Sequence, residues 1–199
     1  MKVVGIFNSI QGEGCNMGIP CTFIRLFGCN LHCSFCDEPT HRQAINVREY
    51  EIADLVRLCM HKLVVVTGGE PTLQAEELKR FIKAARQAGH SVCIESNGTY
   101  EHYDDLDCYV VVSPKREAMY AFFPNGISEL KYVVTEDFNP DVAIPESVRK
   151  RFAGRIWLQP CDSGSMESIK EMWKKCYTIA LRDDRLRVGV QLHKLLEVE

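Results

Sequence analysis

The chain has 199 residues, 46% of them apolar and 26% charged, and its formal net charge is −3. At about 150 residues per domain, this length predicts a single domain over residues 1–199. The nearly balanced charge excludes intrinsic disorder and argues against a nucleic-acid partner, since domains that bind nucleic acids are usually strongly basic. No run of about 18 apolar residues occurs, so the sequence predicts no membrane span.

The chain contains 10 cysteines. Its first residues lack the apolar segment and the small-residue cleavage site of a secretory signal peptide. The cysteines are therefore expected to be reduced thiols in the cytoplasm, some of them bound to a metal.

A series of β-rich runs is predicted as strands, and several are nearly continuous in Val and Ile. Such runs are typical of parallel strands that are covered on both faces. The expected strands are residues 21–27, 63–67, 91–95, 107–113, 129–135, 155–159 and 187–193.

Helical patterns separate several of these strands. Asn46 is a predicted N-cap, with Glu49 completing a capping box, and a second helix is predicted over 75–88 with Gly89 following its end. Ser165 is expected to cap a third helix. Their buried faces are predicted to carry Ile52, Leu55, Val56 and Cys59, then Leu78, Phe81, Ile82 and Ala85, and finally Ile169, Met172, Trp173 and Cys176.

Strand–helix–strand alternation predicts an α/β fold with a parallel sheet and right-handed crossovers. About six core strands are too few for an eight-stranded barrel, which leaves a partial, open barrel or a short doubly wound sheet. In both architectures the chemistry belongs at the carboxyl ends of the strands. The turns at these ends are expected at Gly28 onward, 68–71, 96–98, 113–115 and 159–160.

Three closely spaced cysteines, Cys29, Cys33 and Cys36, follow the first expected strand in the spacing C-x3-C-x2-C. Thiolates are soft ligands for zinc, copper(I) or iron–sulfur clusters. A structural zinc needs four ligands, and His32 or His41 could supply the fourth. An iron–sulfur cluster held by three cysteines would instead keep one iron open for chemistry. Three free thiols in a loop are the remaining interpretation.

The cysteine spacing, with Phe35 before the last cysteine, resembles the radical S-adenosylmethionine (SAM) superfamily. Residues 68–71, Gly-Gly-Glu-Pro, resemble that superfamily's glycine-rich motif, although alone they would be an ordinary turn. The resemblance implies a 4Fe–4S cluster on the three cysteines, with SAM on the fourth iron. One electron would cleave SAM to a radical that abstracts a substrate hydrogen, while the protein supplies position and excludes water.

Further motifs, spread over about the whole chain, resemble the 7-carboxy-7-deazaguanine synthase family of the queuosine pathway. They are residues 8–14, 23–26, 28–30, 36–37, 113–115, 159–162 and 191–194. This resemblance implies a shortened parallel β/α barrel. It also implies a carbon–nitrogen lyase that converts 6-carboxy-5,6,7,8-tetrahydropterin to 7-carboxy-7-deazaguanine with loss of ammonia. Mg²⁺, a flavodoxin-like reductant and a homodimer are implied as well.

The substrate side is expected at the N-terminal loop and the first strand. A carboxylate suits the planar fork of Arg25, which lies in an apolar strand and needs a partner there. That partner could also be a structural carboxylate. The resemblance assigns the pterin edge to Ile10, Gln11, Gly12, Glu13 and Thr67, where a polar glycine-rich loop is the alternative.

The SAM side is expected at the strand ends that follow. By resemblance, Phe35, Cys36 and Asp37 surround the adenine, Gly69 and Glu70 lie at the methionine end, and Ser113, Pro114 and Lys115 lie at the ribose. The turn Gln159, Pro160, Cys161 and Asp162 completes the adenine pocket. Ser96 and Asn97 are further SAM candidates, or simply turn residues.

One position departs from the family pattern. Glu38 stands where the family usually has Thr or Ser as the Mg²⁺ ligand. A carboxylate also suits Mg²⁺ but is longer and charged, and Thr40 could substitute for it. The departure puts metal dependence in question and leaves open a paralogue acting on a related pterin or purine.

Two other functions stay open. A glycyl-radical-enzyme activating protein would share the cysteine spacing and the short chain, although Gln11, Arg25 and residues 113–115 favour a small anionic substrate. A non-catalytic protein with structural zinc at the three cysteines is the alternative from outside enzymology.

Overall fold

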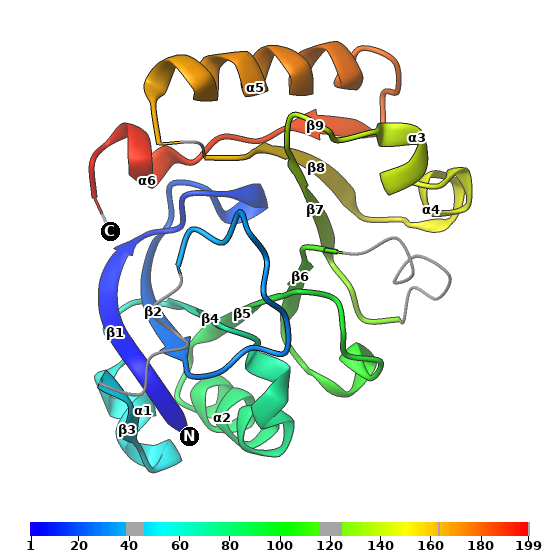
Figure 1. The fold of residues 1–199 in the computed structure, drawn as a ribbon. Coiled ribbons are helices and arrows are strands. Elements are labelled where there is room, and N and C mark those ends of the chain that lie inside the picture. Colours follow the sequence, from blue (N-terminus) through cyan, green and yellow to red (C-terminus); the bar gives the residue numbers. More distant parts are fainter. Residues whose placement is uncertain (39–45, 116–124, 163, 199) are drawn as a thin grey trace.

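The computed structural model describes residues 1–38, 46–115, 125–162 and 164–198. Within them, one nine-stranded sheet runs in the order β3-β1-β2-β4-β5-β6-β7-β8-β9 and curls around a central loop (Figure 1). The strands are β1 (Lys2–Ile10), β2 (Pro20–Leu26), β3 (Arg48–Glu49), β4 (Leu63–Gly68), β5 (Ser91–Ser96), β6 (Tyr109–Val112), β7 (Glu129–Val134), β8 (Arg155–Pro160) and β9 (Leu186–Val188). The helices are α1 (Ile52–Leu58), α2 (Ala75–Gln87), α3 (Pro140–Ala143), α4 (Glu146–Arg151), α5 (Met166–Ala180) and α6 (Leu192–Leu195), with 3-10 turns at Gly14–Asn16, Pro71–Gln74 and Tyr103–Asp105.

From β2 to β9, each neighbouring pair of strands is parallel. The sheet stays open, because β3 and β9 form its two edges and do not pair with each other. The predicted α/β class and the open parallel barrel are therefore confirmed. A connection without an α-helix joins β5 to β6, where the chain makes only the turn Tyr103–Asp105.

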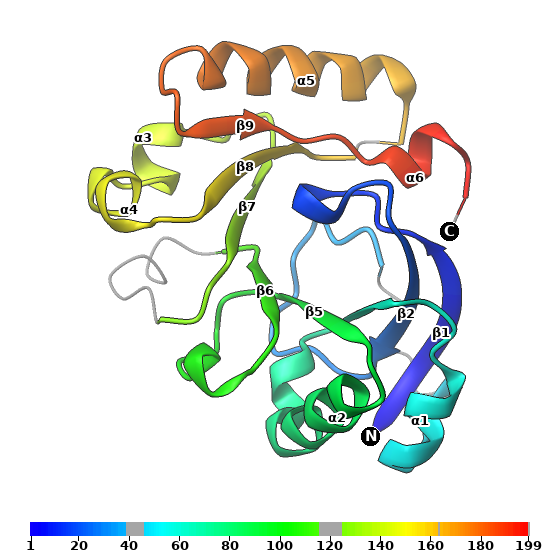
Figure 2. The ribbon, with the colours of Figure 1, turned by 180° about the vertical axis from the view of Figure 1, so that it is seen from behind.

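The helices cover the outside of the curled sheet, with α1 and α2 on one flank and α5 across β8 and β9 (Figure 2). Helix α2 buries the predicted residues Leu78, Phe81, Ile82 and Ala85. In α5 the Ser165 hydroxyl accepts a hydrogen bond from the Ser168 N–H at 3.2 Å, which confirms the predicted cap. Helical periodicity was thus sufficient to identify these two elements.

A strand precedes those expected from the sequence. Strand β1 pairs antiparallel with β2 along most of its length, with an irregularity between Val3 and Gly5. The prediction began the sheet at Cys21 and assigned no strand to the residues before it. The antiparallel pairing places Ile10 beside Pro20, at the amino end of β2.

The capping box predicted at Asn46 and Glu49 is wrong. Arg48 and Glu49 form β3, which pairs antiparallel with β1 at Val3 and Lys2. The helix begins only at Ile52, with an extended Glu51 at its N-cap. The local pattern predicts a helix start here, but backbone hydrogen bonds to β1 at the sheet edge make the segment a strand.

The strand expected over 187–193 is also only partly correct. Strand β9 ends at Val188, and helix α6 begins at Leu192. The Gly189 N–H donates to the Leu158 carbonyl at 2.8 Å, and the Leu192 N–H donates to the Gly12 carbonyl at 2.9 Å. These hydrogen bonds turn the tail back across the barrel opening toward the N-terminal loop.

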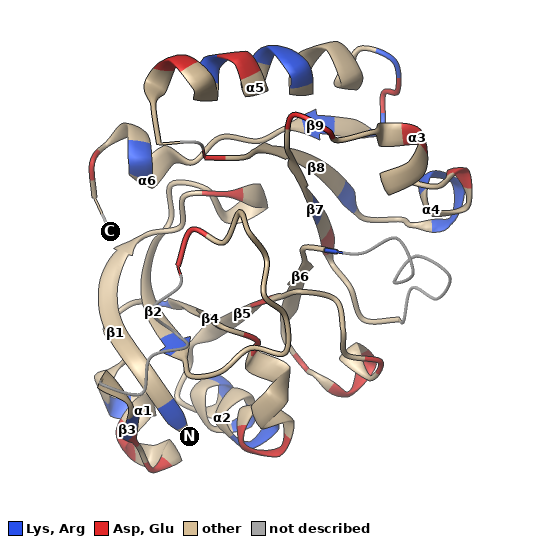
Figure 3. Ribbon diagram, in the orientation of Figure 1, with Lys and Arg blue, Asp and Glu red and all other residues tan. Residues whose placement is uncertain are grey.

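Acidic and basic residues alternate along α5, whereas α2 begins with two acidic residues and continues with basic ones (Figure 3). A smaller number of charged residues lies on the strands and loops around the inside of the barrel. Among the helices that the structure describes, none has both the length and the apolar character required to cross a bilayer.

Candidate active site

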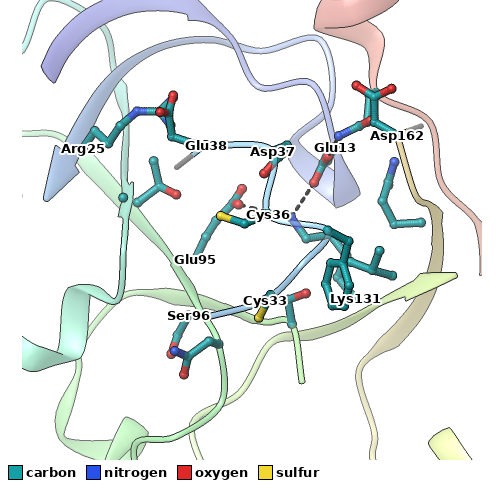
Figure 4. A pocket seen from close by; sticks show the side chains of 18 of the residues that line it. Glu13, Arg25, Cys33, Cys36, Asp37, Glu38, Glu95, Ser96, Lys131 and Asp162 are labelled. Atoms are coloured by element: carbon teal, nitrogen blue, oxygen red, sulfur yellow. Dashed lines mark hydrogen bonds and ion pairs between the residues drawn. The ribbon is translucent and has the colours of Figure 1, made fainter. Parts of the chain in front are cut away.

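One cavity of about 350 Å³ lies at the carboxyl ends of the parallel strands (Figure 4). Its wall comes from the inner face of the sheet, from the cysteine loop and from the C-terminal tail. The predicted residues that line it are Ile10, Gln11, Glu13, Arg25, Cys29, Cys33, Phe35, Cys36, Asp37, Glu38, Thr67, Gly69, Ser96, Asn97, Ser113, Lys115, Gln159, Pro160, Cys161 and Asp162. Most of the predicted site residues therefore share one cavity, and those that follow β2, β4, β5, β6 and β8 do so because the carboxyl ends of parallel strands meet at one edge of the sheet.

The cysteine loop begins where β2 ends. Gly28 has φ +93°, a conformation that side chains disfavour, and it turns the chain into the loop. Cys29, Cys33 and Cys36 are free thiols in the cavity wall. The Leu31 N–H donates to Cys29 Sγ at 3.4 Å. Among the described residues, no three His, Cys, Asp or Glu side chains converge on a single metal ion.

The glycine-rich turn follows β4, next to the cysteine loop. A Cβ atom on Gly68, which has φ +130°, would lie 2.3 Å from the backbone N and O of Leu26. The Glu70 N–H donates to the Gly28 carbonyl at 2.8 Å, which ties the two turns together. Gly68 is thus required by the close approach of two strands, and both Gly68 and Gly69 line the cavity.

Glu70, predicted at the methionine end of SAM, does not line the cavity. Its side chain is fully buried and accepts hydrogen bonds from the Thr72 N–H and hydroxyl, the Ser96 hydroxyl and the Asn97 N–H at 2.6–3.0 Å. Burial raises its pKa despite these bonds. Glu70 therefore fixes the position of Asn97, whose side-chain amide donates to Cys29 Sγ at 3.8 Å and to Asn30 Oδ1 at 2.9 Å.

Gly12 and Pro114 also lie outside the cavity lining. A Cβ atom on Gly12 would lie 1.9 Å from Nδ1 of His193, and the Gly12 carbonyl already accepts the Leu192 N–H. Gly12 therefore makes room for the C-terminal tail, which is a different role from the predicted reading of the pterin edge. His193 itself lines the cavity, and burial lowers its pKa.

At one end of the cavity, Lys131 joins two carboxylates. Its ammonium group pairs with Glu13 and, at 3.1 Å, with Oε2 of Glu95. Burial by itself would raise the pKa of Glu13, but the charge and hydrogen bond of Lys131 outweigh burial and lower it. Burial likewise disfavours the ammonium of Lys131, yet the charges of Glu13 and Glu95 raise its pKa. The Gln11 amide donates to Glu95 at 2.9 Å, and the Gln191 amide donates to Glu13 at 2.9 Å.

The sequence did not assign a role to Glu95 or Lys131. Lys131 lies in the middle of β7, whereas Glu95 is the next-to-last residue of β5, directly before the turn at 96–98 where site residues were expected. A charged residue within an apolar strand was the signal that identified Arg25. The same signal would have found these two residues.

At another part of the cavity wall, Arg25 pairs with Glu38. Nη1 of Arg25 lies 2.7 Å from Oε2 of Glu38, and the guanidinium carbon lies 5.5 Å from the centre of the Phe7 ring. Phe7 stacks on Phe23 with ring centres 5.0 Å apart, and both rings line the cavity. Thr40, the other predicted metal ligand, lies outside the described residues, as does His41.

The SAM-side residues form a polar wall near the cysteine loop. The Lys115 ammonium donates to the Ser113 hydroxyl at 2.7 Å and lies 5.5 Å from the centre of the Phe35 ring. Burial and the charge of Lys131 lower the pKa of Lys115. Asp162 pairs with Lys194 of the tail, and burial raises the pKa of Cys161.

Gln159 is the strongest indication of a missing ligand. Its side chain is 3% exposed and lines the cavity, yet neither atom of its amide has a hydrogen-bond partner among the described residues. An unpaired buried amide is costly, so this group fits a polar ligand placed beside it. The free thiols and this amide together fit a cluster and SAM.

The comparisons with known proteins agree with this site. The Radical SAM superfamily model matches residues 23–109. The chain is 46% identical over 208 residues to 7-carboxy-7-deazaguanine synthase of Methanospirillum hungatei JF-1, covering 98% of this chain and 85% of that protein. It belongs to the 7-carboxy-7-deazaguanine synthase family. The synthase of Aquifex aeolicus is 34% identical over 212 residues, with 98% and 92% covered.

The family's architecture is matched as well. The crystal structure of QueE from Escherichia coli superposes with a TM-score of 0.72 and covers 96% of this chain and 94% of that one, at 24% identity. At that identity the match supports the fold. Membership of the 7-carboxy-7-deazaguanine synthase family separates the chain from both the glycyl-radical activating enzymes and the structural zinc proteins.

Proposed function

We propose that this radical SAM lyase converts 6-carboxy-5,6,7,8-tetrahydropterin to 7-carboxy-7-deazaguanine with loss of ammonia, in queuosine or other 7-deazapurine biosynthesis. The observation that carries the proposal is the shared cavity. The wall of this cavity contains three thiols, and it also contains an arginine and two carboxylates that suit a carboxylated pterin. The chain that forms it is 46% identical to a named synthase.

Cys29, Cys33 and Cys36 are the residues that would hold a 4Fe–4S cluster, since thiolates are its usual ligands. The SAM-side residues are Phe35, Asp37, Gly69, Ser113, Lys115, Gln159, Pro160, Cys161 and Asp162. When bound, the cluster and SAM supply the one-electron chemistry that begins with hydrogen abstraction. The buried amide of Gln159 supports SAM binding, because neither of its polar atoms has a partner among the described residues and a polar ligand beside it would supply one.

On the substrate side, Arg25 would orient the carboxylate through its planar donor fork. Glu13 and Glu95 would accept hydrogen bonds from the ring N–H groups, and Gln11 and Thr67 would contribute further polar contacts. Lys131 supports this assignment by holding Glu13 in its ionised, acceptor form. Because Lys131 pairs with both carboxylates, it would act as a positioning residue.

Mg²⁺ is proposed as an additional cofactor, with Glu38 as its ligand. A carboxylate oxygen is a hard donor that suits Mg²⁺. Glu38 already pairs with Arg25, so it would have to turn from the guanidinium to serve a metal. By resemblance we also propose a homodimer, a flavodoxin-like electron donor and a cytoplasmic location.

The test is product identification under strict anaerobiosis. Reconstituted protein is incubated with 6-carboxytetrahydropterin, SAM and dithionite, with and without Mg²⁺, and the products are analysed by mass spectrometry. We expect 7-carboxy-7-deazaguanine and ammonia in equal amounts. Cleavage of SAM without any deazaguanine product would contradict the proposal, and a colourless protein with stoichiometric zinc would contradict the cluster.

A further inference from the structure

Arg25, the residue expected to bind an anion in the cavity, is already paired with a carboxylate of the same chain, Glu38. Nη1 and Oε2 are 2.7 Å apart, a normal length for a charge-assisted hydrogen bond. The two side chains are 22% and 30% exposed, so they are within reach of a ligand in the cavity. Figure 4 shows the pair on the cavity wall, away from Lys131.

Other cations of the cavity have different partners. Lys131 is held between Glu13 and Glu95, and Lys194 pairs with Asp162. Their carboxylates come from the N-terminal loop, the sheet and the β8 turn. Arg25 also rests on the Phe7 ring, an interaction that fixes the guanidinium without using its N–H groups. Lys115 donates to the Ser113 hydroxyl and lies over the Phe35 ring, on the proposed SAM side of the cavity. Arg25 is therefore the substrate-side cation best placed to receive an external carboxylate, and Glu38 is the carboxylate already there.

We infer that Glu38 is an internal counter-ion of Arg25 that competes with the carboxylate of a ligand. A ligand carboxylate has to replace Glu38 at the guanidinium or bind beside it and be repelled by it. If the ligand replaces Glu38, the binding free energy of its new ion pair with Arg25 is offset by the loss of the ion pair between Arg25 and Glu38. If it binds beside Glu38, that free energy is offset by the repulsion between the two carboxylates. When the ligand leaves, Glu38 returns and spares Arg25 from being left unpaired.

This inference rests on the proposed function, because both the proposed substrate and the proposed product carry a carboxylate. A guanidinium without a competing partner would hold both of them tightly. With Glu38 present, the binding energy that comes from the carboxylate is reduced for both, so the carboxylated product is released more readily. Glu38 is then a determinant of affinity and product release in the metal-free enzyme.

The test is a binding measurement that does not depend on turnover. Cluster-loaded enzyme with SAM, without reductant and with EDTA, is titrated with 7-carboxy-7-deazaguanine and with pterin-6-carboxylate by isothermal calorimetry. In Glu38→Gln we expect Kd to fall about tenfold for both ligands, the ratio that corresponds to one charge-assisted hydrogen bond. Kd for unsubstituted pterin, which lacks the carboxylate, should not change.

Two controls make the result specific. Glu167→Gln removes one negative charge from the exposed first turn of α5, and it should leave every Kd unchanged. In an Arg25→Gln background, replacing Glu38 should lower Kd by much less, because the competition for the guanidinium is gone and only the repulsion between the two carboxylates is relieved.

Equal or weaker binding of both carboxylated ligands by Glu38→Gln would overturn the inference while leaving the proposed function intact. Failure of both wild type and Glu38→Gln to bind either carboxylated ligand would contradict the proposed function, and the inference would fall with it.

Discussion

The two faces of the sheet use the same strands for different purposes. On the outer face, successive strands contribute Ile24, Val66, Ile94, Leu130 and Ile156, which are fully or almost fully buried against the helices. The inner face begins with a second, smaller apolar layer made of Cys21, Leu63, Val65, Cys93 and Val111. Toward the carboxyl ends it becomes polar, with Arg25, Thr67, Glu95, Ser113 and Lys131.

Neighbouring residues on one strand therefore belong to different environments. Ile94 is buried in the outer core, whereas Glu95 faces the cavity and pairs with Lys131. Side chains alternate between the two faces of a strand, so each strand can stabilise the fold with one set of residues and present chemistry with the other. Substitutions on the outer face should thus change stability, and those at the polar end of the inner face should change function.

The largest functional effect is expected at Cys33. In Cys33→Ala one of three thiolate ligands is removed, so we expect loss of the cluster and of all product formation. Iron and sulfide analysis together with the mass-spectrometric assay would measure both. Cys59→Ala is the matched control, because it removes another half-buried thiol at the end of α1, outside the cavity. A full complement of iron in Cys33→Ala would refute the assignment.

Lys131 tests whether the inner face also contributes to stability. Lys131→Met leaves Glu13 and Glu95 as buried like charges, and breaking a buried pair in this way costs about 3–5 kcal/mol near pH 7. The comparable change Lys79→Met, at an exposed pair on α2, should lower the free energy of unfolding much less, because solvent screens that pair. Denaturant unfolding of both variants would give the two values.

The stability of Lys131→Met relative to wild type is also expected to depend on pH. The folded-state pKa of Glu13 lies below its ordinary value of 4.5, so its pairing with Lys131 stabilises the fold fully above that value. This contribution disappears as the pH falls through the lowered pKa. The stability difference between wild type and Lys131→Met should therefore shrink as the pH falls toward and through that lowered pKa. A difference that stays constant with pH would show that the ion pair is not its source.

The outer face and the cavity position were predictable from the sequence, for physical reasons. Apolar periodicity reports burial directly, and parallel strands place their carboxyl ends at one edge. Arg25 was identifiable because a charge in an apolar strand needs a partner. The identity of that partner, Glu38, depends on how the cysteine loop folds back over β2, which no local pattern encodes.

The predictions that were wrong share one cause. Arg48 and Glu49 form a strand because β1 offers a free edge, and the tail leaves β9 early because Leu192 bonds to Gly12. Glu70 sits in a recognisable motif, yet its side chain turns into the interior toward Ser96 and Asn97. Each outcome is decided by interactions between segments that are distant in sequence, and these override local preference.

A pair of variants on β5 sharpens the comparison between the two faces. Ile94→Ala should cost about 2–5 kcal/mol through the cavity it leaves in the outer core, with KM unchanged. Glu95→Gln should leave thermal stability nearer to that of the wild type and raise KM for the pterin by about tenfold, the equivalent of one hydrogen bond to the substrate. Unfolding curves and steady-state kinetics on both proteins provide the test. If Ile94→Ala altered KM as strongly as Glu95→Gln, the two faces would not be functionally separate.

The smallest expected effect concerns Asn97, where the interior network reaches the cysteine loop. Its amide donates to Cys29 Sγ at 3.8 Å, and hydrogen bonds to ligating sulfurs raise the potential of iron–sulfur clusters. Asn97→Leu should therefore shift the midpoint potential to a modestly more negative value, measured by redox titration without SAM so that cofactor contacts do not contribute. Asn30→Ala removes the other acceptor of the same amide but keeps the N–H···S hydrogen bond, so its potential should stay closer to that of the wild type. Equal shifts in the two variants would mean that the network only holds the loop in place, whereas a shift confined to Asn97→Leu would assign the tuning to that single hydrogen bond.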